Sequence, residues 1–262
     1  RSIADRFRSK QKRQLSSQLG KDLIRLCGKG QAKMQEVAQM FRLAVFFCVL
    51  ILGIENGVLP GAAEIEYWKW IGVVLCLASA LMSRGKGQQA DPLSLLVLTG
   101  CALADLFLLF TRQWETGIAG FCLVQLCLSF SLISREQTLQ LCLILGGLFF
   151  IAGLLLKLPE MICLVMFYAI QTSFNLSAAL RMLTHTFLLK FAFDKLGKNP
   201  SELQPPSADI RFRFWTAMGT VLLALCDLNV VLFQLGGPLA AAGGWIWPFY
   251  LPALLCFAHA AR

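Results

Sequence analysis

The stretch Leu93–Phe110, LSLLVLTGCALADLFLLF, has the length and apolarity of a membrane-crossing helix and carries one charged residue, Asp105. A helix needs about 20 predominantly apolar residues to span the hydrocarbon core of a bilayer, and similar runs recur along the chain of 262 residues. Hydrophobic residues make up 57% of the chain and charged residues only 15%, against about 25% charged residues in soluble domains. The sequence therefore predicts an all-α, polytopic transmembrane bundle.

Eight apolar runs predict eight spans within a transmembrane domain of residues 40–262. The predicted spans are Met40–Ile54, Trp68–Met82, Leu93–Phe110, Gly117–Ile133, Leu139–Leu156, Pro159–Ala179, Phe212–Phe233 and Leu239–Ala258. Residues 1–39 form a basic N-terminal segment in which Leu15, Leu19, Leu23 and Leu26 recur at helical spacing. This pattern indicates an amphipathic helix on the inner membrane surface or, as the alternative, a solvated and partly disordered tail.

The basic residues indicate the orientation. With the N-terminus inside, 21 of the 24 Lys and Arg residues fall on the cytoplasmic side, and only Lys69, Arg112 and Lys157 fall outside. The positive-inside rule thus favours an even number of spans with the N and C termini both cytoplasmic. The net charge of +9 suits contact with anionic membrane lipids. No nucleic-acid partner is expected, because no recognised motif accompanies the charge. We expect an integral, multi-pass membrane protein, in the plasma membrane if it is bacterial.

Metal and disulfide chemistry are not expected. Nine of the ten cysteines lie in apolar runs, and none forms a Cys-x-x-Cys pair. They are typical of small apolar packing residues, and no cofactor or metal ligand set is predicted. The chain begins at Arg1 without a methionine, which we interpret as processing or trimming of the start. No signal peptide is expected, because the first apolar run begins only near Phe41.

A second acidic residue, Asp227, lies in Phe212–Phe233, and its surroundings (Leu-Cys-Asp-Leu) match those of Asp105 (Leu-Ala-Asp-Leu). A carboxylate costs roughly 2.5–3.5 kcal/mol at the centre of a membrane helix. Both acids are expected in the outer half of the bilayer at similar depth. Small residues on the same helical faces direct both into the bundle. Because the acids occupy the third and seventh spans, a four-helix internal repeat is possible.

The paired acids allow a functional and a structural interpretation. In a desolvated site, one acid can stay protonated and donate a proton, while the other stays ionised and orients water or stabilises positive charge. That division suits acid-catalysed cleavage of an acetal-like or enol-ether bond. In the structural interpretation, each acid only forms hydrogen bonds between helices.

Further polar residues in the predicted spans are candidates for substrate binding. The same residues could instead join helices, as such polar stripes often do. These candidates are Gln125, Tyr168, Gln171, Asn175 and Asn229.

The segment from Leu98 to Ile133 resembles the YhhN family of membrane proteins. In that family an apolar helix carries Gly-Asp followed by leucines, and a short turn leads to a Gly-x-x-x-Phe helix. Asp105 stands at the acidic position, with Gly117 and Phe121 at the two later positions.

A second segment, Gly219–Phe233 (GTVLLALCDLNVVLF), resembles the family's Gly-rich helix with Ser-Asp, and Tyr168 through Ala179 resembles its sixth helix. The resemblance covers most of the chain from Phe41 onward. The departures are Ala104 for Gly, Cys226 for Ser, Gln125 for His, and Tyr250 without the family's nearby Gln.

The resemblance implies a lysoplasmalogenase. Such enzymes hydrolyse the vinyl ether bond of lysoplasmalogens, which are lysophospholipids, to a fatty aldehyde and a glycerophospho-base. Asp105 and Asp227 are then the catalytic groups, and no cofactor is needed. The residues alone leave two alternatives, a proton- or solute-coupled transporter and a non-catalytic lipid-binding or sensory bundle.

Overall fold

The computed structural model describes residues 46–51, 53–55, 65–84, 91–195 and 208–261. Within these ranges the chain is helical and contains no strand, as the sequence predicts. The elements are α2 (Ile65–Arg84), α3 (Pro92–Leu106), η2 (Phe107–Thr111), α4 (Trp114–Leu132), α5 (Arg135–Leu156), α6 (Glu160–Lys195), α7 (Ala208–Leu235), η4 (Gly237–Trp245) and α8 (Ile246–Ala260). A further apolar helical stretch covers Phe46–Glu55 apart from the undescribed residue 52.

Six helices of the described chain are long and apolar enough to cross a membrane. They correspond to the second through seventh predicted spans. The first predicted span is only partly described, as the helix of Phe46–Glu55, and the predicted N-terminal segment 1–39 lies outside the described residues. The helix α6 continues to Lys195, well beyond the predicted end at Ala179.

The last predicted span, Leu239–Ala258, is helical, but its winding changes part-way along. The chain first forms a 3-10 helix, η4, and only then the shorter α-helix α8. Gly236 and Gly237 turn the chain with φ of 71° and 60°, a left-handed conformation that glycine adopts without steric cost. Pro238 follows at the start of η4 and provides no backbone N–H. Glycine and proline therefore separate α7 from α8 by an irregular turn.

Local sequence explains where the central helices begin. The side chain of Asp91 accepts a hydrogen bond of 2.8 Å from the backbone N–H of Ser94, and Pro92 occupies the first turn of α3. Ser134 accepts from the N–H of Gln137 in the same way at the start of α5. Both are N-cap arrangements that satisfy a backbone donor without an intrahelical partner.

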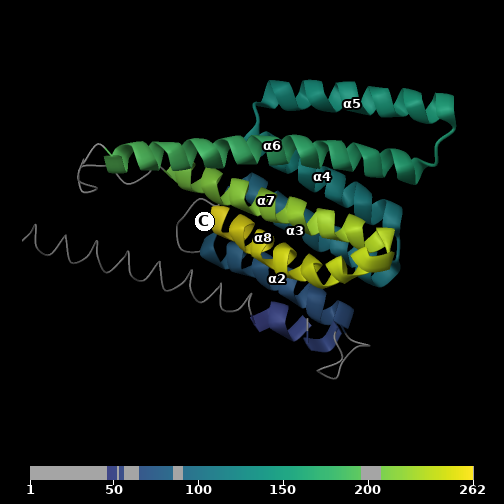
Figure 1. The fold of residues 1–262 in the computed structure, drawn as a ribbon, viewed down its shortest axis with the longest axis horizontal. Helices are drawn as coiled ribbons and strands as arrows, with labels where there is room; N and C mark the ends of the chain where they lie inside the picture. Colours follow the sequence, from purple (N-terminus) through teal and green to yellow (C-terminus); the bar gives the residue numbers. More distant parts are fainter. Residues whose placement is uncertain (1–45, 52, 56–64, 85–90, 196–207, 262) are drawn as a thin grey trace, which may run out of the picture. The chain divides into compact units, whose positions relative to one another are not determined.

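The main core lies among α2, α3, α4, α7, α8 and the helical stretch of Phe46–Glu55. The helix α7 packs along α8 and α6, α3 packs along α4, and α2 packs against α3 and α8 (Figure 1). The largest buried side chains of this core include Phe257, Leu98 and Leu254. The two acidic residues lie on α3 and α7, which belong to this core.

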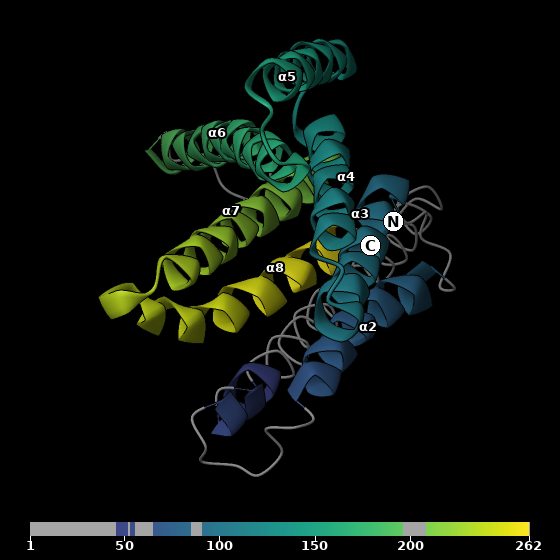
Figure 2. The same ribbon diagram turned by 90° about the vertical axis from the view of Figure 1, so that its right-hand side faces the viewer.

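The helix α5 lies at the edge of the structure, beside α6 and away from α2 and α8 (Figure 2). Its apolar side chains are strongly exposed, with Leu143 at 75% and Leu155 at 77% of their full exposure. Exposed leucines over a helix of 22 residues suit contact with lipid tails, which are as apolar as leucine itself.

Two close backbone approaches hold the core helices in register. A Cβ atom on Gly120 of α4 would lie 3.0 Å from the Cβ of Ala104 on α3, and a Cβ on Gly219 of α7 would lie 2.6 Å from the Phe257 ring on α8. Small residues allow such approaches between membrane helices. The first crossing lies beside Asp105, so it helps to set the position of that carboxyl relative to α4.

Candidate functional site

Asp105 lies on α3 in the interior, with 6% of its surface exposed. The hydroxyl of Tyr250, on α8 and itself 4% exposed, donates a hydrogen bond of 2.6 Å to Oδ2 of Asp105. Such a short distance is typical of an O–H donor on a carboxyl oxygen. The carboxyl of Asp105 thus points into the helical core, as the sequence predicts.

Asp227 lies on α7 and is half-buried. The hydroxyl of Tyr168, on α6, donates to Oδ2 of Asp227, again at 2.6 Å. The chain has three tyrosines, and two of them therefore bind the two intramembrane acids with the same geometry. This repeated Asp–Tyr arrangement makes the two acids comparable chemical groups.

Aromatic and thiol groups lie beside the two Asp–Tyr pairs. The ring of Phe121, on α4, lies 6.3 Å from the Tyr168 ring and 6.5 Å from the Tyr250 ring, measured between centroids. Two buried thiols accompany the acids on the same helices, because Cys101 lies one turn before Asp105 on α3 and Cys226 directly precedes Asp227 on α7. We call Asp105, Tyr250, Phe121, Tyr168 and Asp227 the paired-acid site.

A directed series of hydrogen bonds ends at Asp227. The hydroxyl of Ser129 lies 2.8 Å from Oδ1 of Asn175, the Nδ2 of Asn175 donates to Oε1 of Gln125 at 2.8 Å, and the Nε2 of Gln125 donates to the Tyr168 oxygen at 3.4 Å. Ser129, Asn175 and Gln125 are each at most 1% exposed. Because Tyr168 accepts from Gln125, its own proton is directed to Asp227.

Two of the predicted substrate-binding residues do not join this network. Gln171 faces α5, where its Nε2 donates to the sulfur of Cys142 at 3.7 Å, and its Oε1 is buried without a partner. Asn229 donates to the carbonyl of Leu225 in its own helix at 2.7 Å. The structure thus brings Gln125, Tyr168 and Asn175 to Asp227, and it does not bring Gln171 or Asn229 there.

Tyr250 was not among the sequence-predicted site residues. A signal for it exists, because its hydroxyl is a polar tip in the otherwise apolar helix Ile246–Ala260, and a buried tyrosine hydroxyl needs a partner. The sequence cannot show that the partner is Asp105, which lies 145 positions earlier in the chain.

The helix that carries Asp105 changes its winding directly after the acid. Residues Phe107–Thr111 form a π-helical turn, and Arg112 then adopts the left-handed conformation with φ of 56°. π-Helical turns within α-helices are frequent at functional sites. α3 thus ends at Leu106, one residue beyond Asp105, and the π-helical turn leads toward the start of α4.

The described residues contain no group of three or more His, Cys, Asp or Glu side chains arranged to hold a metal ion. The acids are partnered by phenols, and the thiols of the site are spread over different helices. The polar groups of the site are thus carboxyls, hydroxyls and amides, which suit proton transfer and charge stabilisation.

Comparison with protein families matches residues 66–261 to the YhhN family. The chain belongs to the YhhN family. The matched range runs from α2 to the end of α8 and contains every residue of the paired-acid site. No curated protein and no solved structure gave a match.

Proposed function

We propose that this YhhN protein is a multi-pass membrane hydrolase that cleaves the vinyl ether bond of lysoplasmalogen-like lysophospholipids. The products are a fatty aldehyde and a glycerophospho-base. The observation that carries the proposal is the paired-acid site, in which two buried or half-buried aspartates each accept a 2.6 Å hydrogen bond from a tyrosine. In the proposed topology both termini are cytoplasmic, and the substrate comes from the surrounding membrane lipids.

The hydrogen-bond directions support different roles for the two acids. The series from Ser129 through Asn175 and Gln125 directs the Tyr168 proton onto Asp227. A carboxyl oxygen that accepts a charge-assisted hydrogen bond is stabilised in its ionised form. Asp227 is therefore assigned the ionised role.

Asp105 is assigned the acid role. It is the more deeply buried of the two, and burial disfavours a charged carboxylate. When Asp105 is protonated, Tyr250 donates to its carbonyl-type oxygen, Oδ2, and the proton sits on Oδ1. Two carboxyls in different environments can divide acid and base work in this way.

The reaction then proceeds by proton transfer to carbon. Asp105 delivers its proton to the second carbon of the vinyl ether, the C=C electron pair forms the new C–H bond, and the first carbon becomes an oxocarbenium ion. Asp227 stabilises this cation and takes a proton from the water that attacks it. In the collapse of the hemiacetal, its hydroxyl proton moves to the departing glycerol oxygen, which gives the aldehyde and the glycerol hydroxyl. Transfer of the proton held by Asp227 to Asp105 then restores both acids.

The test uses the full chain purified in detergent with lysoplasmenylethanolamine as substrate. Wild type is expected to release fatty aldehyde, and Asp105→Asn and Asp227→Asn are each expected to lower the rate at least a hundredfold. Glu115→Gln provides the matched control, because Glu115 is an exposed acid at the start of α4. Activity that survives both single aspartate changes would reject the assigned roles.

A further inference from the structure

A charged pair lies next to the paired-acid site and has no part in the chemistry above. The ammonium of Lys69, on α2, lies 2.8 Å from Oε1 of Glu55, and only 15% and 27% of the two side chains are exposed. The same ammonium lies 5.4 Å from the centre of the Trp247 ring on α8. Lys69, Glu55 and Trp247 thus form one contact group, which we call the lysine–tryptophan cluster.

The cluster is connected to Asp105 through stacked rings. The Trp247 ring meets the Tyr250 ring edge to face at 5.3 Å, and the Tyr250 hydroxyl binds Asp105. In addition, the indole of Trp70 donates to the carbonyl of Ala102 at 3.1 Å. Because Trp70 follows Lys69 and Ala102 lies one turn before Asp105, Lys69 is at nearly the depth of that acid.

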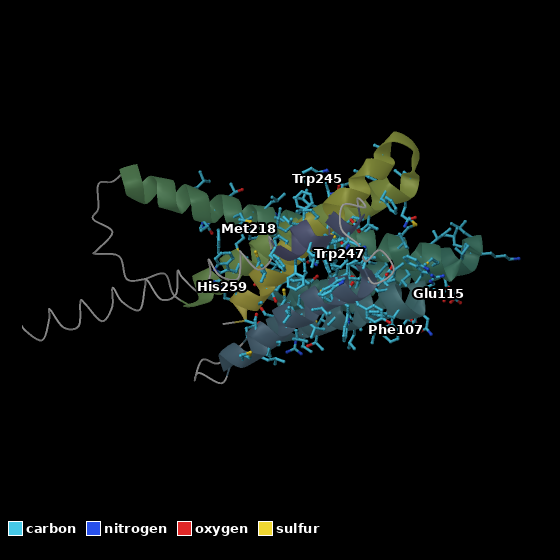
Figure 3. The ribbon with its side chains drawn as sticks, turned by 90° about the horizontal axis from the view of Figure 1, so that it is seen from below. Phe107, Glu115, Met218, Trp245, Trp247 and His259 are labelled. Carbon is cyan, nitrogen blue, oxygen red and sulfur yellow. The ribbon has the colours of Figure 1, made fainter. Side chains whose placement is uncertain are left out.

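The position of the cluster along the helices agrees with this placement. Met218 and His259 lie toward one end of the structure and Phe107 and Glu115 toward the other, with Trp247 between them (Figure 3). Two aromatic rings in series, those of Trp247 and Tyr250, therefore lie between the Lys69 ammonium and Asp105.

Stability does not explain why a largely covered ion pair occurs here. Removing two charges from water costs several kcal/mol per ion, and the attraction between them often only balances that cost. A zwitterionic ligand explains the pair. Lys69 can give up its contact with Glu55 to bind the negative group of the ligand, while Glu55 binds the positive group.

We propose that the lysine–tryptophan cluster is the headgroup subsite of the lipid, with Lys69 binding the phosphate, Glu55 binding the headgroup amine and Trp247 lying against the amine. An ammonium is a common point-charge ligand of phosphate, and an amine over the face of an indole gains a cation–π interaction. The inference rests on the proposed function, because it assigns this cluster to the headgroup of the lipid whose vinyl ether bond Asp105 protonates.

The cluster offers one cation and one anion, and this combination also predicts which lipid headgroups bind. A zwitterionic phospho-amine offers an anion for Lys69 and a cation for Glu55. A lipid with a bare phosphate offers no cation and brings its negative charge toward Glu55, which costs affinity. An alkenylglycerol without phosphate cannot use the subsite at all.

The experiment compares two substrates, lysoplasmenylethanolamine and the corresponding 1-alkenylglycerol without phosphate. Lys69→Met and Glu55→Gln are each expected to raise KM at least tenfold for the phospholipid, with kcat nearly unchanged, and to leave both constants unchanged for the alkenylglycerol. Lys157→Met is the matched control, since Lys157 is an exposed basic residue in the turn after α5. Equal losses on both substrates would show a structural role and overturn the inference.

A binding measurement separates this inference from the proposed reaction. The probe is the saturated 1-O-alkyl lysophosphoethanolamine, which has no vinyl ether and reports binding alone through tryptophan fluorescence. Weaker binding to Lys69→Met than to wild type supports the subsite even where no aldehyde is released. Equal binding of the probe by both proteins overturns it, even where wild type hydrolyses vinyl ethers.

Discussion

The two tyrosines of the paired-acid site are predicted to be unequal, although their hydrogen bonds have the same length of 2.6 Å. Tyr168→Phe removes a donor from an ionised carboxylate, whereas Tyr250→Phe removes a donor from a neutral acid. Hydrogen bonds to charged groups contribute about 1.5–3 kcal/mol, and neutral ones about 0.5–1.5 kcal/mol. Since about 1.4 kcal/mol corresponds to a tenfold change in rate, Tyr168→Phe should lower kcat about 10- to 150-fold and Tyr250→Phe about 2- to 12-fold.

The assay is aldehyde release by the purified variants at saturating lysoplasmenylethanolamine, together with the thermal unfolding midpoint of each protein. The control is Tyr67→Phe, because Tyr67 is 59% exposed and only contacts the ring of Phe110. We expect KM to stay within about twofold for both site variants, since neither hydroxyl is assigned to headgroup binding. If Tyr250→Phe lost as much kcat as Tyr168→Phe or more, the assignment of acid to Asp105 and base to Asp227 would be refuted.

Three further predictions concern packing, the hydrogen-bond series and topology. Gly219→Ala places a methyl group 2.6 Å from the Phe257 ring and should destabilise the fold by about 1–3 kcal/mol through overpacking, measured as a lower thermal midpoint in detergent. Asn175→Leu leaves Oε1 of the buried Gln125 without its donor, so it should cost about 1–3 kcal/mol of stability. It should also lower kcat, because Gln125 no longer holds Tyr168 in a fixed orientation. Cysteines introduced at exposed Gln113 and Gln137 should react with an impermeant maleimide from opposite sides of the membrane, with Gln113→Cys labelled from outside.

Each of these predictions has a matched comparison. Gly146→Ala adds a methyl group on α5 where nothing lies within 4 Å, so its thermal midpoint should not fall. If the midpoints of Gly146→Ala and Gly219→Ala fell equally, Gly219 would not be a packing contact. Ser177→Ala removes a hydroxyl that bonds only to its own helix at Ser173 and should leave kcat unchanged, unlike Asn175→Leu. Labelling of Gln113→Cys and Gln137→Cys from the same side would contradict the proposed orientation.

The predictable part of this fold is the part governed by hydropathy and spacing. Runs of apolar residues predict the middle helices to within a few residues, because a membrane helix must satisfy its backbone internally and expose apolar side chains. The same reasoning predicts the break between Phe233 and Leu239, where Gly236 and Gly237 turn the chain, but fails to predict the 3-10 winding of Gly237–Trp245. It also fails at the end of α6, where a mixture of apolar, polar and charged residues beyond Arg181 continues the helix to Lys195.

For the site, the sequence predicts the two acids and misses most of their geometry. Asp105 and Asp227 are conspicuous because a carboxylate is costly in an apolar helix. Tyr250 and Lys69 do not stand out in the sequence, because a tyrosine or a lysine near a helix end is ordinary in membrane proteins. Their roles depend on contacts between α2, α3 and α8, which no local pattern encodes. Likewise, Gln171 and Tyr168 lie three residues apart on α6, yet only Tyr168 reaches an acid.

The most direct test of the proposed hydrolysis is mass spectrometry of the aldehyde that the purified protein forms from lysoplasmenylethanolamine in D₂O. Proton transfer from an aspartic acid to the vinyl carbon predicts an aldehyde with one deuterium on its second carbon from wild type, and at least a hundredfold less aldehyde from Asp105→Asn. No aldehyde from wild type, an aldehyde without that deuterium, or undiminished product from Asp105→Asn would contradict the mechanism.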